Sequence, residues 1–555
     1  MMLHTLPLTN PHPRVLAFGH FQGQYCHRVN KEVRVHEQGC PFPLRRRRMS
    51  SQGRRHRNLG FGSRLVLRSQ GASPTLQDAG FTQEGEKHEV DMVALQKAAS
   101  AAQNLPYSGR KAVVVGAGPG GSTAAMVLAR QGFTVDVFEK RPEPAADVVD
   151  TGRAYIIALI PRGQATLERL GIPLPSSDHY RSLGTVRHPD KGEQRVTQET
   201  GNRTFSRSDL AQMLVDEARR RFPSQIKFHF GREASKINLA EKQVTLSAQD
   251  ELDLVLSYDL LVGADGTGSR VRAAMQEQDG WTAEISDSGR EYKVYQGLRA
   301  DLEPPEFKGK TGATLHLYTT NDSFTTVTAH RNPDNSYSGT FSMRTGEHAK
   351  YNTQEAYEAL LREKFSALPP HWVPEIAKQA VQAKASSAGK RIKCPQLHSN
   401  GAIILGDAAH AVTPVFGQGA NSALESCRVL DDTLTACTDP STGKGEPQLI
   451  PAAFSKERKA DVHALWWIDA AAYSFFAKRP GVDFFALLAH VLVGTVFGKL
   501  LPGLYGGPKP ALLSLGKASM PYSSIYQAVQ RDAAGVLAGL GTFLLLISLK
   551  IAGVL

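Results

Sequence analysis

Short apolar runs alternate with helical patterns through the middle of the chain. Runs at 111–115, 258–263 and 401–405 are rich in Val, Leu and Ile, and each leads through glycines into a helical pattern. Repeated strand-then-helix units predict an α/β domain around a mainly parallel sheet. Alternating apolar and polar positions at 313–330 predict a second sheet, and residues 445–555 are predicted to be mainly helical.

The C-terminal end of the chain is almost uncharged. Residues 533–549 contain no charged residue, and the stretch to 555 adds only Lys550. At ~1.5 Å per helical residue these spans reach roughly 25 and 34 Å, against a bilayer core of ~30 Å, so we predict a membrane anchor over 533–555. A buried core helix is the alternative, because three glycines in the span would suit close packing. The interrupted apolar run 484–507 predicts a helix that lines an apolar pocket or lies in a membrane interface.

Positive charge is concentrated at the N-terminus. The 555-residue chain has a net charge of +12, and residues 1–72 hold 13 Lys and Arg against two acidic residues, which leaves the remainder near neutral. A folded part that is nearly neutral argues against nucleic-acid binding, which needs a basic face. An Arg-rich, acid-poor leader is typical of an organelle transit peptide, with a solvated tail as the alternative. We predict a chloroplast location, or alternatively a mitochondrial one.

The region after this leader carries few structural signals. Residues 73–107 are predicted to be a polar linker with one short helix near 90–102, and Met49 begins a second plausible leader. The five cysteines include no Cys-x-x-Cys pair. We therefore predict neither a disulfide scaffold nor a metal site.

The first glycine turn has the spacing of a phosphate-binding loop. Gly116, Gly118 and Gly121 form a G-x-G-x-x-G sequence between a β-branched run and an Ala-rich helical pattern. The first glycine permits a tight turn, the second lets backbone amides approach a pyrophosphate, and the third lets helix and strand pack closely. Glu139 ends the next apolar run, where it can accept from ribose hydroxyls, and Lys140 adjoins it. We therefore predict an adenine dinucleotide site.

Two further turns extend this site. Asp265 and Gly266 end the second apolar run, and Asp407 follows the third. Carboxylates or bare amides at several strand ends suit a long ribityl-pyrophosphate chain, whereas a nicotinamide nucleotide needs only the first motif. We therefore predict FAD, with bare backbone amides supplied where the next helical pattern opens, at Gly417, Gly419 and Asn421.

These motifs, in this order, resemble the flavoprotein aromatic hydroxylase family. Segments 152–172, 205–214, 416–427 and 520–540 are most similar to the kynurenine 3-monooxygenases of that family, and the likeness spans about 108–555. It implies a Rossmann-like FAD-binding domain at 108–290 and 395–444, an interposed substrate-domain sheet at 291–394, a helical region at 445–532 and the anchor at 533–555. It also implies that Arg153 and Arg207 lie along the flavin and its phosphates, with a solvated helix-end arginine as the alternative for each. It further implies that Asp407 binds the ribityl chain, and that backbone amides reach the isoalloxazine and the pyrophosphate from four residues: Gln418, Gly419, Ala420 and Asn421. His410 is interpreted as a packed histidine rather than a base, because the chemistry is carried by the cofactor.

The substrate side departs from the family pattern. Kynurenine enzymes hold a carboxylate with an arginine and a tyrosine, but this segment has Gly201 near the tyrosine position and only Arg181 and Arg187 nearby. The resemblance leaves Tyr526 and His463 as candidate substrate residues. Losing the donors of a carboxylate clamp should change the class of substrate. The aromatic residues at 466–476 are either core or a pocket for a lipophilic substrate.

The function implied is that of a monooxygenase. NADPH or NADH would reduce FAD, and one oxygen atom of O₂ would pass to a small aromatic or lipophilic organic molecule. No catalytic side chain is predicted, because the cofactor carries the reaction. A plastid FAD-dependent reductase or epoxidase of an isoprenoid or carotenoid is one alternative, and a membrane-tethered flavoprotein with a non-catalytic role is another.

Overall fold

The computed structural model describes residues 104–143, 156–190, 193–198, 201–249, 251–320, 324–476, 481–500 and 511–552. The predicted transit peptide 1–72, almost all of the predicted linker and Arg153 lie outside these residues. The first described strand begins at Lys111, as predicted.

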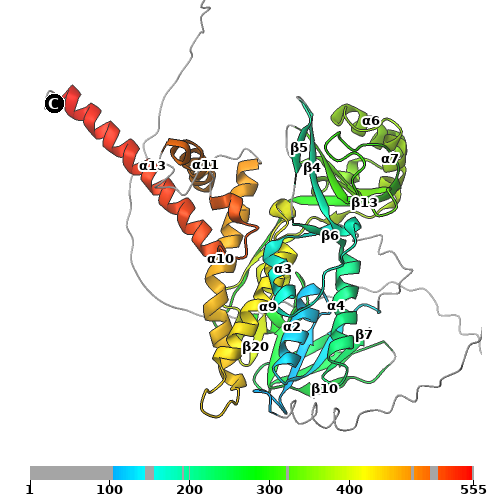
Figure 1. Cartoon of the computed structure of the whole chain (residues 1–555), viewed down its shortest axis with the longest axis vertical. Helices are drawn as coiled ribbons and strands as arrows, with labels where there is room; N and C mark the ends of the chain where they lie inside the picture. The colour runs from blue at the N-terminus through cyan, green and yellow to red at the C-terminus, as the bar shows by residue number, and fades with distance from the viewer. Residues whose placement is uncertain are drawn as a thin grey trace, which may run out of the picture. The chain divides into compact units, whose positions relative to one another are not determined.

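A six-stranded sheet, of which β20 and β7 are labelled in Figure 1, carries the predicted glycine turns. Its order is β19-β20-β11-β1-β2-β7, and every neighbouring pair is parallel except β19 with β20. The four inner strands are almost completely buried apolar runs, as expected for a parallel sheet covered by helices, whereas the edge strands β7 and β19 are partly exposed. Their bounds are β1 (Lys111–Val115), β2 (Thr134–Glu139), β7 (Ile226–Phe230), β11 (Leu260–Gly263), β19 (His398–Ser399) and β20 (Ala402–Ile404).

Helices that follow these strands pack on the sheet and on each other. Pro119 at the first turn of α2 and Ser206, whose hydroxyl accepts from Asp209 N at the start of α4, set two of the helix starts. Ala-rich α2 packs against α9 and α4, and α3 packs against α9. The bounds are α2 (Pro119–Arg130), α3 (Pro161–Arg169), α4 (Arg207–Arg221), α5 (Arg270–Gln276), α8 (Asp407–His410) and α9 (Gly419–Ala436).

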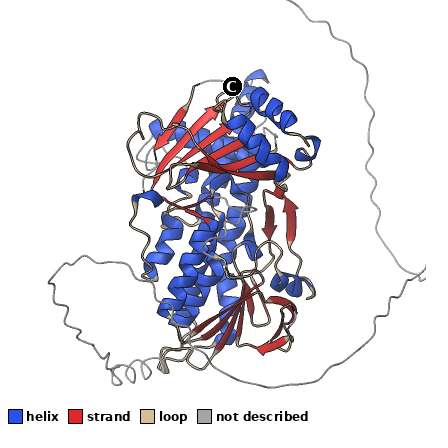
Figure 2. Cartoon of the chain, turned by 90° about the vertical axis from the view of Figure 1, so that its right-hand side faces the viewer, coloured by secondary structure: helices blue, strands red, loops and turns tan. Residues whose placement is uncertain are grey.

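A second, seven-stranded sheet has the order β17-β13-β16-β15-β14-β4-β5. Helices α6 (Gln354–Lys364) and α7 (Trp372–Gln382) pack on one face of it around a separate apolar core, as Figure 2 shows from the side. Its strands are β4 (Ser182–Pro189), β5 (Arg195–Gln198), β13 (Arg290–Leu298), β14 (Ala313–Thr319), β15 (Thr326–Arg331), β16 (Tyr337–Arg344) and β17 (Ser386–Ser387).

This sheet corrects the predicted boundaries. Strands β4 and β5 lie within 108–290, assigned to the FAD-binding domain, yet they belong to the second sheet. The reason is a long-range parallel pairing of β4 with β14, which alternation along the sequence cannot show. The remaining small sheets are β3 (Ile156–Leu159) with β6 (Arg203–Ser206), β8 (Glu233–Asn238) with β9 (Gln243–Ser247) and β10 (Leu254–Ser257), and β12 (Glu284–Asp287) with β18 (Lys390–Lys393).

Three long helices complete the chain: α10 (Ile450–Phe476), α11 (Val482–Leu500) and α13 (Tyr522–Ile551). The predicted helical character of the C-terminal region is confirmed, but α13 is one continuous helix across the predicted boundary at 532. Its outer part is exposed, with Leu537 70% and Phe543 60% accessible, which contradicts the alternative of a buried core helix. In the described part of the chain, α13 is the one helix long and apolar enough to cross a membrane, by length and composition.

Candidate flavin site

The glycines of the first turn have two different functions. Gly116 has a φ of +103°, and a Cβ there would lie 2.4 Å from the carbonyl oxygen of Ala264. A Cβ on Gly121 would lie 1.9 Å from the Gly116 oxygen. Both glycines are therefore required by the fold itself. Gly118, which precedes α2, has nothing within 4 Å of an added Cβ, so the open space that a phosphate group needs is at this glycine.

Glu139 lies beside this turn at the end of β2. Its Oε2 accepts from Ala117 N at 3.1 Å, and its Oε1 accepts from Arg141 Nε at 2.8 Å. Burial alone would raise the pKa of Glu139, but the bonds and charge of Arg141 hold it below its ordinary value. The carboxylate is therefore ionised at neutral pH and able to accept from a ribose. Lys140 follows it and is exposed.

The second turn lies next to the first, because Ala264 contacts Gly116. Asp265 Oδ2 accepts from the backbone of Arg270 at 2.6 Å at the start of α5. Its Oδ1 is buried and has no hydrogen-bond partner among the residues that the structure describes. Burial raises the pKa of Asp265, against the hydrogen bonds that it accepts. Gly266, with a φ of +77°, has open space at its Cβ position.

The third turn brings three predicted residues together. Asp407 begins α8, and a Cβ on Gly419 would lie 3.9 Å from its Oδ1. Burial raises the pKa of Asp407, and the positive charge of Arg207 opposes this effect. Ala420 is half-buried in the first turn of α9. The Asp407 carboxylate and the first amides of α9 therefore meet at the carboxyl edge of the sheet.

Asn421 and Gln418 hold this turn through their side chains. Asn421 Oδ1 accepts from Ile160 N at 3.0 Å, and its Nδ2 donates to Ala158 O and Gly417 O, both at 2.9 Å. Gln418 Nε2 donates to Phe416 O at 3.0 Å, and its Oε1 accepts from the Tyr522 hydroxyl at 2.8 Å. The predicted contribution of these residues to a cofactor is thus through backbone amides. The sequence analysis missed Tyr522, because 104 residues separate it from Gln418.

His410 and Tyr526 both lie close to the third turn. His410 is buried, its Nε2 lies 3.1 Å from Ser426 Oγ, and burial with the nearby Arg458 charge lowers its pKa to about 3. The interpretation as a packed histidine is confirmed. Tyr526 packs edge-on against Trp467 in an apolar cluster that includes Phe416, close to the third turn.

The other substrate-side residues do not gather there. His463 Nε2 lies 2.7 Å from the carbonyl oxygen of Cys394, a bond that accounts for its position in α10 without a substrate. Arg181 and Arg187 are both exposed. Gly201 has a φ of +83° and its carbonyl accepts from Gln164 Nε2. The described residues of this segment therefore do not form a buried arginine–tyrosine clamp.

The converging turns fit FAD. Open space lies at Gly118, Gly266 and Gly417. An orphaned Asp265 oxygen and the ionised Glu139 lie at the ends of the two strands that flank β1. An extended chain of phosphate, ribose and ribityl groups would satisfy all of these groups together. The fold and site therefore define a flavin-dependent oxidoreductase class.

Comparison with known proteins supports this assignment. The model of the FAD binding domain family matches residues 110–466. Kynurenine 3-monooxygenase of Salinispora tropica is 29% identical over 445 residues, which is 76% of this chain and 91% of that protein. The enzyme of Drosophila willistoni is 28% identical, over 75% of this chain and 89% of its own length.

Solved structures agree on the fold. PqsL, a probable FAD-dependent monooxygenase from Pseudomonas aeruginosa, superposes with a TM-score of 0.52 at 20% identity, over 67% of this chain and 97% of that one. The oxygenase of 2-methyl-3-hydroxypyridine-5-carboxylic acid gives 0.51 at 21% identity, over 67% of this chain and 91% of that one. The chain belongs to the FAD-dependent aromatic hydroxylases and is an FAD-dependent monooxygenase, most like kynurenine 3-monooxygenase.

Proposed function

We propose that this monooxygenase uses NADPH or NADH to insert one oxygen atom from O₂ into an aromatic or lipophilic organic molecule. The observation that carries the proposal is the meeting of three glycine turns, Glu139, Asp265 and Asp407 at one sheet edge. When bound, FAD supplies the redox chemistry and the reaction with O₂.

The residues of the chain would bind FAD, orient it and shield its ring from water. When FAD is bound, the amides at the starts of α2 and α9 would face its phosphates, and Glu139 would accept from the ribose. Asp407 would bind the ribityl chain, and Arg207 would lie along the flavin and its phosphates. Phe416, Trp467 and Tyr526 lie in an apolar cluster beside the third turn, where they would exclude water from the flavin ring. No side-chain acid or base is assigned to the oxygen transfer.

We infer that the substrate is not gripped by its carboxylate as in the kynurenine pattern, because Arg181 and Arg187 are exposed. The test uses detergent-purified full chain, with NADPH and NADH oxidation recorded with and without L-kynurenine, and with product mass. Oxidation that L-kynurenine does not stimulate, with no product heavier by one oxygen, is expected. A stimulated reaction with an oxygenated product would refute this inference about the substrate. Flavin that NAD(P)H never bleaches would refute the monooxygenase proposal in favour of a non-catalytic flavoprotein.

The exposed face of α13 supports attachment to a membrane, and the Arg-rich leader supports import into the chloroplast, or alternatively the mitochondrion. A lipophilic substrate could then reach the site from the bilayer. The isoprenoid or carotenoid reductase and epoxidase remain the second candidate, favoured by the exposed arginines. Import of the full chain into isolated chloroplasts and mitochondria, followed by carbonate extraction, tests location and attachment together.

A further inference from the structure

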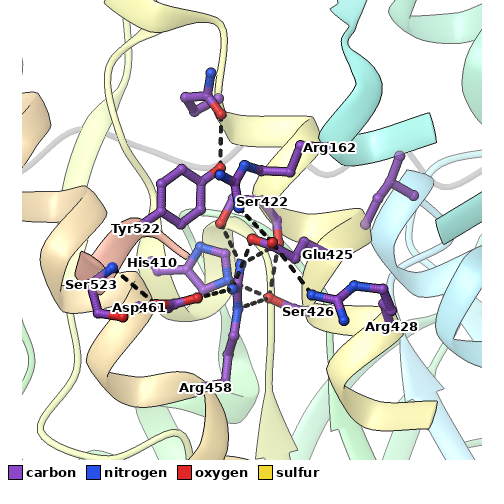
Figure 3. A network of polar contacts seen from close by, with 12 residues as sticks. Arg162, His410, Ser422, Glu425, Ser426, Arg428, Arg458, Asp461, Tyr522 and Ser523 are labelled. Atoms are coloured by element: carbon purple, nitrogen blue, oxygen red, sulfur yellow. Dashed lines mark hydrogen bonds and ion pairs between the residues drawn. The ribbon is translucent and has the colours of Figure 1, made fainter. Parts of the chain in front are cut away.

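A buried network of charged groups joins helices α3, α9, α10 and α13 (Figure 3). Arg162 of α3 and Arg458 of α10 both pair with Glu425 of α9, at 2.6 and 2.8 Å. All three side chains are at most 2% exposed. Arg458 also donates to Ser422 and Ser426 of α9. Groups buried this deeply must be fully paired, so the network fixes these helices relative to one another.

The start of α13 is built into this network. Arg162 donates to the carbonyl oxygens of Leu515 and Met520, and its guanidinium lies 4.0 Å from the centre of the Tyr522 ring. The Ser523 hydroxyl donates to Asp461 at 2.6 Å. The inner end of α13 is therefore docked on the FAD-binding part of the chain, while the outer end is exposed and apolar.

One bond continues from this docked end to the cofactor side. The Tyr522 hydroxyl donates to Gln418 Oε1 at 2.8 Å, and both side chains are buried. The Gln418 amide in turn donates to Phe416 O. Gly417, between them, has a φ of +61°, so the turn at 413–421, which we call the flavin loop, passes through a left-handed position. The Gln418 side chain holds that turn through its bond to Phe416 O, and the Tyr522 hydroxyl fixes the orientation of the Gln418 amide.

We propose that Tyr522 is a positioning residue of the flavin loop, which makes the first turn of α13 a part of the cofactor site. The inference rests on the proposed binding of FAD at this loop. With the hydroxyl in place, the Gln418 amide has one orientation, its oxygen on Tyr522 and its nitrogen on Phe416. Without it, the buried amide oxygen loses its donor, and the amide and the loop gain alternative arrangements.

The test compares Tyr522→Phe with Tyr107→Phe in full-length protein. Tyr107 is equally buried, and its hydroxyl donates to Leu434 O at 2.8 Å, near the other end of α9. Each variant deletes one buried hydroxyl that donates a hydrogen bond: Tyr107 donates to α9 itself, and Tyr522 donates to Gln418, the residue before α9. Tyr522→Phe should weaken FAD binding about three- to tenfold, the size of one lost hydrogen bond, and shift the visible flavin spectrum. Tyr107→Phe should lower the thermal midpoint comparably and leave FAD affinity and spectrum unchanged.

A second variant protects the test against failure to fold. Gln418→Leu removes the same bond from the other side, and the double variant with Tyr522→Phe should weaken FAD binding much less than the two single effects multiplied together. The inference would be overturned if the double variant showed the product of the two single effects on FAD affinity. It would also be overturned if Tyr522→Phe had the same FAD affinity and spectrum as Tyr107→Phe. Either result would leave FAD binding itself in place. Full-length protein that binds no FAD would instead overturn the proposed function, and this inference with it.

Discussion

Replacing Glu425 with glutamine removes the one carboxylate shared by two buried arginines. Arg162 and Arg458 are 0% and 1% exposed in their side chains, so water cannot replace the lost charge. Losing one member of a buried pair typically costs about 3–5 kcal/mol. Arg458 retains Asp461 at 3.3 Å, and Arg162 retains two carbonyl acceptors. We therefore expect the lower end, about 3 kcal/mol, or roughly a hundredfold in the unfolding equilibrium.

The assay is urea unfolding of the full chain in detergent, followed by tryptophan fluorescence and by flavin release. Glu347→Gln is the control, because Glu347 pairs with Lys350 on the surface, where such pairs contribute about 0–1 kcal/mol. Glu425→Gln should shift the midpoint strongly and the control hardly at all. Equal midpoints for the two variants would refute the reasoning that the network is desolvated and obligatory.

A triple variant refines this result. Replacing Arg162, Glu425 and Arg458 together by Met, Leu and Met removes every charge of the central triad, so no arginine is left buried without its carboxylate. Asp461 loses Arg458 but still accepts from the Ser523 hydroxyl. This variant should be more stable than Glu425→Gln alone, although Leu515 O and Met520 O lose their donor. A triple variant less stable than the single one would mean that hydrogen bonding, not charge pairing, dominates the network.

Three other experiments test separate parts of the molecule. Gly118→Ala should fold normally but lose FAD, because its Cβ would occupy the open space that the phosphates need. Gly116→Ala should fail to fold, because its Cβ would meet the Ala264 carbonyl oxygen; the yield and the flavin content of the two variants are compared. Burial raises the pKa of Asp469 to about 6. The folded protein therefore holds this proton more tightly than the unfolded chain, and the contribution of Asp469 to the free energy of unfolding falls as pH rises from about 4 to 6. Asp469→Asn should flatten this decline, as measured by urea midpoints across that pH range. Identical pH slopes would contradict this. Ending the chain at residue 532 should abolish carbonate-resistant membrane association while flavin content is retained; a truncated chain still in the membrane pellet would contradict α13 as the anchor.

Local sequence signals were sufficient to predict the parallel strands and the glycine turns that form the candidate flavin site. The runs at 111–115 and 258–263 became adjacent parallel strands, and the paired turns followed because parallel strands end at the same edge. Gly116 and Gly121 are predictable for the same reason, since their roles depend on sterics within a few residues. The sequence pattern could not reveal that β4 crosses into the second sheet, because its partner β14 is more than 120 residues away.

The same limit explains why the docked end of α13 was not predicted. In the sequence, Tyr522 is one aromatic residue near a helix start. Its hydroxyl reaches Gln418 because α13 packs on α10 and α10 packs on α9, contacts between distant parts of the chain. Asn421 shows the converse case. Its position after the Gly-x-Gly turn suggested contact with the cofactor, but its side chain is fully used in holding Ile160 and Ala158. Sequence could therefore predict which loop lies at the carboxyl edge of the sheet beside Asp407, but not which side chains hold that loop.

The two ends of α13 place opposite demands on the same helix. The outer end exposes leucine and phenylalanine over several turns, which favours removal from water. The inner end carries Tyr522 and Ser523 into a charged network that must stay buried and fully paired. Since α13 is continuous between them, one helix carries both the exposed apolar segment and the tyrosine whose hydroxyl donates to Gln418. Both demands are met together only when the outer end leaves water and the first turn stays in the charged network.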